Sequence, residues 1–164
     1  MNTPQPPIPI FVVENDNIFV KMLDYIFSKD IVFKFYEFKS EEDCLKNLSL
    51  KPEVVILDHS LSGVMNGSDT IRQIKKNNSR AHIIILMNSN DEKLASKLLN
   101  AGASDYVFKD TQGPDEIIRR LEAFLSRKNV TKPFFIPQGK PSLKSVGYFL
   151  LILLALSLGV YFYK

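Results

Sequence analysis

Three ionisable residues each stand directly after a short apolar run of the sequence. Glu14 follows FVV, Asp58 follows VVIL, and Lys109 follows YVF. Two carboxylates that lie close together suit Mg²⁺, which prefers oxygen ligands and keeps several of its waters. A lysine opposite them can pair with an anion that the metal also holds, so that one carboxylate attacks a phosphoryl group. These residue types therefore point to phosphoryl transfer onto an aspartate, provided that the fold brings them together.

Residues 8–128 alternate between two hydrophobic periods, and this pattern predicts the elements that position the three side chains. The expected strands are 8–13, 31–38, 53–57, 82–87 and 104–108, and the apolar stripes of the helices fall at 18–27, 45–48, 71–74, 94–99 and 117–125. Asp16 and Ser40 are expected to cap the first two helices. Near-continuous apolar strands joined by helices indicate an α/β domain with a parallel sheet covered on both faces. Ligands of such sheets bind beyond the carboxyl ends of the strands, where the three ionisable residues should meet.

The order and spacing of three motifs resemble the receiver domain of two-component response regulators. The motifs are FVVENDN at 11–17, VVILDHSLSGVMNG at 54–67 and LLNAGASDYVFKD at 98–110. The resemblance covers residues 8–128, essentially all of the chain before the final apolar segment. It implies a flavodoxin-like (βα)5 fold, in which a doubly wound, five-stranded parallel sheet has the order 2-1-3-4-5.

The resemblance also implies a role for each residue at the rim. Asp58 would be the phosphoacceptor, and Lys109 would contact the phosphoryl group. Mg²⁺ would be held by Glu14, by Asp58 and by the backbone carbonyl of Ser60, with Asn15 as a further candidate ligand. The phosphoryl group would come from a histidine kinase or a phosphotransfer protein.

Three positions depart from the family pattern. Asn15 stands in place of a second carboxylate, which should lower the affinity for Mg²⁺. Met87 stands where the family has Thr or Ser, and a thioether cannot donate a hydrogen bond to a phosphoryl oxygen. Ser89 could supply a hydroxyl only if its loop is re-routed, and Ser62 replaces a usual proline. Because Met87 and Tyr106 occupy the switch positions of the family, we expect Asp58 to be phosphorylated while the usual output switch is damped.

The chain changes character after residue 128. Residues 129–145 contain three prolines and a glycine and are expected to form a linker. Residues 146–163 carry no charge and would make a helix of about 27 Å, close to the roughly 30 Å of a hydrocarbon core. We expect a single-pass, tail-anchored transmembrane helix, since the alternative, a buried helix of the soluble domain, would keep a polar face. Five basic residues between 127 and 144 predict that the domain lies in the cytoplasm at the cell inner membrane.

Composition excludes several other functions. The net charge is +3, but residues 1–128 hold all 18 acidic residues and 17 of the 21 basic ones, so no strong basic field predicts nucleic-acid binding. The single cysteine, Cys44, excludes an internal disulfide and is expected to pack in the core. His59 and His82 are not spaced as a metal pair, and His59 is expected to face solvent beside the acceptor.

Two functions remain open. The first is a membrane-tethered, single-domain response regulator receiver, phosphorylated on Asp58 in a phosphorelay, which acts through protein contact or phosphate relay. It would be no enzyme beyond catalysing its own phosphorylation. The alternative is a degenerate receiver that docks proteins at the membrane without phosphorylation. Asn15 and Met87 favour it, whereas Asp58 and Lys109 favour the first. A hydrolase with an aspartyl intermediate would need a second acid where Ser60 stands.

Overall fold

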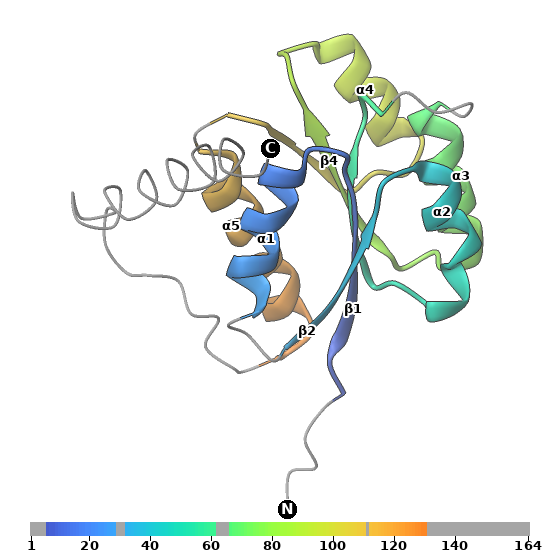
Figure 1. Cartoon of the computed structure of the whole chain (residues 1–164). Helices are drawn as coiled ribbons and strands as arrows, with labels where there is room; N and C mark the ends of the chain where they lie inside the picture. Colours follow the sequence, from blue (N-terminus) through green and yellow to red (C-terminus); the bar gives the residue numbers. More distant parts are fainter. Residues whose placement is uncertain (1–5, 29–31, 62–65, 111, 131–164) are drawn as a thin grey trace, which may run out of the picture. The chain divides into compact units, whose positions relative to one another are not determined.

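Five parallel strands form one sheet in the computed structural model, which describes residues 6–28, 32–61, 66–110 and 112–130 (Figure 1). Their order is β2-β1-β3-β4-β5, and every neighbouring pair is parallel. The strands are β1 (Ile8–Val13), β2 (Phe33–Phe38), β3 (Val54–Asp58), β4 (His82–Met87) and β5 (Asp105–Phe108). The doubly wound parallel sheet expected from the sequence is therefore confirmed.

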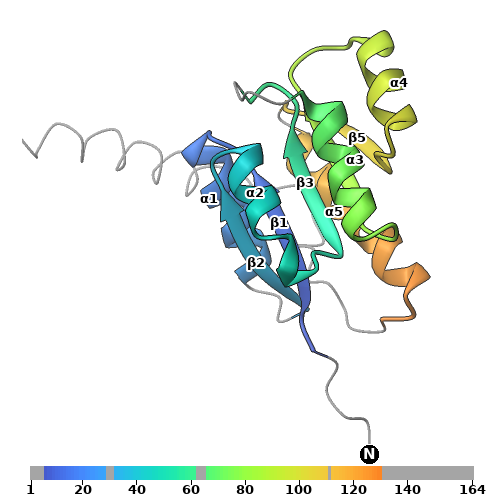
Figure 2. The same cartoon turned by 90° about the vertical axis from the view of Figure 1, so that its right-hand side faces the viewer.

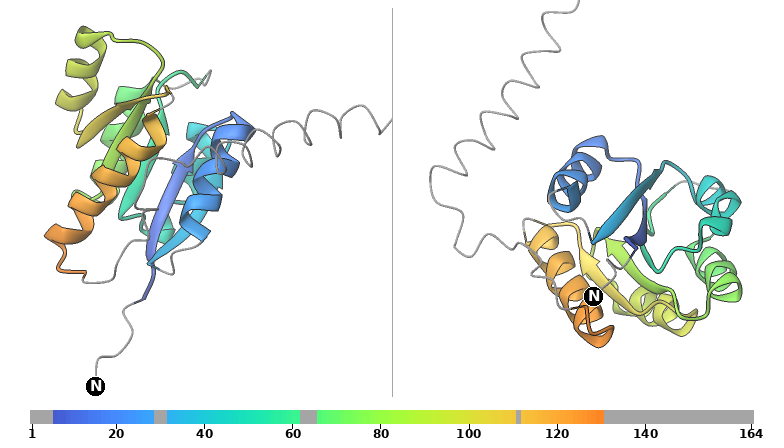
Figure 3. Two further views of the ribbon diagram at one scale, coloured as in Figure 1. Left: turned by 90° about the vertical axis from the view of Figure 1, so that its left-hand side faces the viewer. Right: turned by 90° about the horizontal axis from the view of Figure 1, so that it is seen from below.

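Helices cover both faces of this sheet. They are α1 (Asn17–Ser28), α2 (Glu41–Lys46), α3 (Gly67–Asn77), α4 (Glu92–Asn100) and α5 (Gly113–Arg127), with a 3₁₀ turn at Leu48–Leu50. Helices α1 and α5 pack on one face, whereas α2, α3 and α4 pack on the other (Figures 1 and 2). The view from below in Figure 3 shows the sheet between these two layers. This is the flavodoxin-like arrangement, with one helix after each strand.

Polar side chains begin the helices at the expected places. Asp16 Oδ1 accepts hydrogen bonds from the N–H groups of Ile18 and Phe19 at 2.8 and 3.2 Å. Ser40 Oγ accepts from the N–H of Asp43 at 3.1 Å. Both contacts satisfy helix donors that have no partner within the helix. The caps predicted at Asp16 and Ser40 are confirmed.

Two apolar layers fill the space between the sheet and its helices. On β1, Ile10 and Val12 face α1 and α5, whereas Phe11 and Val13 face the other helices. Cys44 is fully buried in the second layer, as expected, and burial raises the pKa of its thiol to about 12. Each fully buried aliphatic or aromatic side chain contributes roughly 1.5–3 kcal/mol to folding. The alternation of faces therefore determines which of the two helix layers each strand residue packs against.

The central strand β3 is buried along its whole length, including Asp58. Its register pairs Leu57 with Val13 of β1 and Asp58 with Leu86 of β4. A slip by one residue would exchange the side chains that face the two helix layers and would displace Asp58 from the end of the sheet. The strand thereby holds Asp58 at the carboxyl rim.

The predicted transmembrane helix at 146–163 and the linker from residue 131 onward lie outside the described residues. Among the helices that the structure does describe, none combines the length and the apolar character that a membrane crossing requires.

Candidate functional site

Glu14, Asp58 and Lys109 meet at the carboxyl end of the sheet. Glu14 follows β1 directly, Asp58 is the last residue of β3, and Lys109 follows β5 directly. The pairing of β1 with β3 places the two carboxylates side by side. The ammonium of Lys109 reaches across β4, so that its Nζ lies 2.7 Å from Glu14 Oε2 and 2.9 Å from Asp58 Oδ2. The structure thus brings together the three residues that the strand ends pointed to.

These three side chains form a buried charge cluster, with Glu14 0% and Asp58 1% exposed. Burial alone would raise the pKa of Asp58, but hydrogen bonds from Ser60 and Lys109 hold this pKa below its usual value. Burial raises the pKa of Glu14, and the contacts with Lys109 and the N–H of Asp16 only partly offset this rise. Burial would lower the pKa of Lys109, but its two carboxylate partners raise it. Ser60 and Lys109 therefore favour the ionised form of Asp58, which is the form that can attack a phosphoryl group.

Ser60 and Asn88 form a hydrogen-bonded chain that holds Asp58. Asp58 Oδ1 accepts from the N–H of Ser60 at 2.8 Å and from its hydroxyl at 2.7 Å. The side-chain amide of Asn88 donates to Ser60 Oγ at 3.0 Å. The sequence singled out only the carbonyl of Ser60, and it missed Asn88 altogether. The one available signal was position, because Asn88 is the first polar residue after β4.

The donor set around Glu14 fits a hard cation such as Mg²⁺. Glu14 Oε1 accepts the N–H of Asp16 at 2.9 Å, whereas the buried Oε2 contacts Lys109 but has no well-aligned hydrogen-bond donor. Asn15 is exposed next to it. Within the described residues, no group of three or more His, Cys, Asp or Glu side chains is placed so that it could hold a metal ion by itself. A cation here would thus be held by Glu14, Asp58, the Ser60 carbonyl and Asn15, with water completing its shell.

Met87 and Tyr106, the two positions that we expected to act as a switch, bring little polar chemistry to this site. Met87 is fully buried in the layer under α4, and its backbone carbonyl accepts the N–H of Lys109 at 2.8 Å. Tyr106 is partly buried on β5 and packs edge-on against Phe108, with ring centroids 5.6 Å apart. Ser89 is exposed, and the side chain that is linked to Asp58 through Ser60 is that of Asn88.

His59 differs from the expectation that it faces solvent. Its imidazole is 17% exposed, and Nδ1 lies 2.8 Å from the carbonyl of Leu86 on β4 and 3.8 Å from Asp58 Oδ1. The backbone N–H of His59 also donates to this carbonyl, at 3.2 Å. His59 therefore fixes the turn after Asp58 to the neighbouring strand.

Comparisons with known proteins agree with this geometry. The family model of the response regulator receiver domain matches residues 10–122. The chemotaxis protein CheY of Thermotoga maritima is 30% identical over 116 residues, which cover 67% of this chain and 92% of CheY. The nitrate/nitrite response regulator protein homolog of Haemophilus influenzae is 33% identical over 75 residues, or 46% of this chain, and the chain spans only 35% of that relative's length.

A solved structure shows the same fold. The BeF3-activated receiver domain of DrrB, a Thermotoga maritima protein, superimposes with a TM-score of 0.66 at 28% identity, covering 74% of this chain and 99% of that domain. The family match extends over most of the described residues, and it includes Glu14, Asp58 and Lys109. The chain therefore belongs to the response regulator receiver domain family.

Proposed function

We propose that this receiver takes a phosphoryl group onto Asp58 from a histidine kinase or a phosphotransfer protein. The observation that carries the proposal is the buried cluster in which Lys109 Nζ lies within hydrogen-bond distance of both Glu14 and Asp58. A pure docking surface has no use for two carboxylates and a lysine whose burial costs free energy. The cluster is costly for folding but well suited to phosphoryl transfer.

In the transfer step, an oxygen of the ionised Asp58 attacks phosphorus. The new O–P bond forms while the N–P bond of the phosphohistidine donor breaks, and the electron pair of that bond returns to the imidazole nitrogen. Lys109 neutralises charge on the transferred oxygens, because its ammonium already lies 2.9 Å from the acceptor. Ser60 and Asn88 keep the carboxylate oriented. Mg²⁺ held by Glu14, Asp58, the Ser60 carbonyl and Asn15 would add positive charge beside the phosphoryl oxygens.

The experiment is phosphorylation of the full chain, purified in an uncharged detergent, with acetyl phosphate and with a histidine kinase in the presence of Mg²⁺. We expect an alkali-labile label on the wild type, as an acyl phosphate gives, and none on Asp58→Asn. The matched control is Asp110→Asn, which removes an exposed carboxylate next to Lys109 and should retain the label. Label that persists in Asp58→Asn would refute the assignment of the acceptor.

A second function is favoured by one observation, the buried thioether of Met87, which offers no hydroxyl to a phosphoryl group. In this reading the chain is a degenerate receiver that docks a protein partner without phosphorylation. The same assay decides between the two, because a docking module takes no label from any donor. Persistent binding of a partner to Asp58→Asn would also support docking.

We infer further that residues 146–163 anchor the chain in the cell inner membrane with the receiver domain in the cytoplasm. Support comes from the uncharged 18-residue segment and from the basic residues before it. Tethering would raise the local concentration of the receiver near membrane-bound kinases, and its output would be protein contact or phosphate relay rather than DNA binding. Extraction of cell membranes with alkaline carbonate tests the anchor. The full chain should stay in the pellet, and a chain ending at residue 145 should not.

A further inference from the structure

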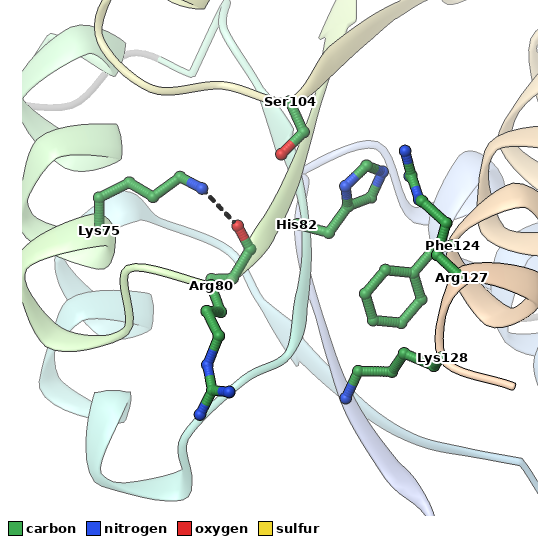
Figure 4. Close-up of a pocket in the computed structure, with 8 residues that line it drawn as sticks. Lys75, Arg80, His82, Ser104, Phe124, Arg127 and Lys128 are labelled. Atoms are coloured by element: carbon green, nitrogen blue, oxygen red, sulfur yellow. Dashed lines mark hydrogen bonds between the residues drawn. The ribbon is translucent and has the colours of Figure 1, made fainter. Parts of the chain in front are cut away.

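A basic cavity of about 350 Å³ opens at the end of the sheet opposite to Asp58 (Figure 4). It lies where α3 ends, β4 begins and α5 ends, so three elements that are distant in the sequence contribute to it. Its walls include Lys75, Arg80, His82, Phe124, Arg127 and Lys128. The acceptor cluster, formed by Glu14, Asp58 and Lys109, is at the carboxyl end of the strands, whereas His82 is the first residue of β4. The cavity is therefore separate from the phosphoacceptor site.

The positive charge of this cavity is largely uncompensated. Lys75 donates to the carbonyls of Ala81 and Ser79 at 2.7 and 3.3 Å, which are neutral partners. Arg80 and Arg127 are exposed and form no ion pair within the part of the chain that the structure describes. Only Lys128 is paired with a carboxylate, that of Glu53. Three cations without a carboxylate partner in the described structure therefore line one pocket, with the guanidinium groups of Arg80 and Arg127 on different sides of it (Figure 4).

The remaining wall supplies a flat apolar surface and neutral hydrogen-bonding groups. His82 stacks on the ring of Phe124 at 5.3 Å, and its buried Nε2 has no hydrogen-bond partner among the described residues. Burial lowers the pKa of His82, and Arg127 and Lys75 add to this effect against the opposing charge of Asp105. The imidazole is therefore neutral. Ser104 Oγ accepts the N–H of Ile83 at 3.1 Å, which leaves its own proton available to donate.

We propose that this cavity binds a phosphate group, carried by a small soluble phosphate or by the headgroup of an anionic phospholipid. Arginine forks match the tetrahedral oxygens of phosphate, and several cations that line one pocket favour an anion with more than one charge over a single carboxylate. The pocket, about 350 Å³ in volume, has room for a phosphate group. The lipid source has a separate argument, which rests on the membrane anchor proposed above. The linker that leads to residue 146 begins at Asn129, immediately after Lys128 in the cavity wall.

The test is a titration of the full chain in uncharged detergent with inorganic phosphate, without Mg²⁺ and at constant ionic strength. The readout is the NMR signal of the His82 imidazole, with His59, the other histidine of the chain, as the internal reference. We expect a saturable shift of His82. Arg80→Gln/Arg127→Gln should raise the half-saturating concentration about tenfold or more, since charge-assisted contacts are lost.

The matched control is Arg72→Gln/Arg119→Gln, which removes the same charge from two arginines whose side chains are each 61% exposed outside the cavity. This variant should keep the wild-type affinity within about twofold. Equal weakening in both double variants, or a shift that never saturates, would overturn the proposal, because bulk attraction alone would then explain the response. Acetate binding as tightly as phosphate would overturn the choice of anion.

Two further measurements test whether phosphate binds in this cavity or at Asp58, and whether the phosphate belongs to a lipid or to a soluble molecule. Asp58→Asn should leave the shift of His82 intact, and its loss would assign the phosphate to the acceptor end and refute the cavity. Mixed micelles that contain phosphatidic acid, without free phosphate, are compared with micelles of phosphatidylcholine. A shift with phosphatidic acid that Arg80→Gln/Arg127→Gln removes identifies a lipid headgroup, whereas a response to inorganic phosphate alone identifies a soluble ligand.

Discussion

Replacing Lys109 by Met tests whether the acceptor cluster is a coupled electrostatic unit. The substitution keeps a long, unbranched side chain but removes the only cation that lies within 3 Å of Glu14 Oε2 and Asp58 Oδ2 in the described structure. Both carboxylates are at most 1% exposed, so water cannot replace the lost charge without opening the site. Removing one member of a buried ion pair typically costs about 3–5 kcal/mol. We expect Lys109→Met to lower the free energy of unfolding at neutral pH by about this amount.

The stability that Lys109→Met loses should become smaller as the pH falls. Burial already raises the pKa of Glu14 above 4.5 in the wild type, and loss of the ammonium should raise it further. As the pH falls through this raised pKa, Glu14 takes up a proton and no longer repels Asp58. The deficit of Lys109→Met should therefore shrink toward acid pH. Mg²⁺ should stabilise the variant more than the wild type, because a cation bound only by the folded state compensates for the missing ammonium.

The assay is urea unfolding of the full chain in uncharged detergent, followed by circular dichroism across pH and with or without Mg²⁺. The control is Lys76→Met on the exposed surface of α3, which should change the free energy of unfolding by no more than about 0.5 kcal/mol. A loss below about 1 kcal/mol for Lys109→Met, or a loss that does not change with pH, would refute the coupled cluster.

Three further predictions concern single side chains. Ser60→Ala removes the hydroxyl donor to Asp58, so the pKa of this carboxylate should rise. The rate of phosphorylation at Asp58 should then begin to fall at a higher pH than in the wild type when the solution is acidified, which a pH–rate profile measures. Met87→Thr buries a hydroxyl in an apolar layer and should lower the free energy of unfolding in urea by about 1–3 kcal/mol. Phosphorylation of this variant should also change the NMR signal of Tyr106 more than it does in the wild type. Glu41→Gln should raise the free energy of unfolding at neutral pH, because burial raises the pKa of Glu41 and so penalises its charged form. Urea titrations should show the difference from the wild type at neutral pH but not at acid pH, where Glu41 is protonated.

The parallel α/β architecture and the three residues that meet at the carboxyl end of the sheet could be predicted from the sequence. The strands are short apolar runs, and the parallel order of the sheet places their carboxyl ends together, so Glu14, Asp58 and Lys109 had to approach one another. The helix caps at Asp16 and Ser40 were also predictable, since they depend on residues two or three positions away.

Contacts between distant parts of the chain were not predictable in the same way. Glu41 accepts a hydrogen bond from Thr70, 29 residues later, and it is 1% exposed although acids in the first turn of a helix usually face solvent. Asn88 reaches Ser60 from a separate loop, and His59 binds the carbonyl of Leu86. These contacts depend on how neighbouring strands are aligned, and local periodicity carries no information on them. The basic cavity was missed for the same reason, because its cations come from separate elements and look like ordinary surface charges in the sequence.

The pairing of β3 on both sides has a consequence for changes in the length of this chain. Insertions before Asp58 would break the pairs with Val13 and Leu86 and displace the acceptor. Insertions after Ser60 leave those pairs intact, since the strand ends at Asp58 and loops tolerate changes in length. A change in chain length after Ser60 should therefore disturb the position of Asp58 less than the same change before it.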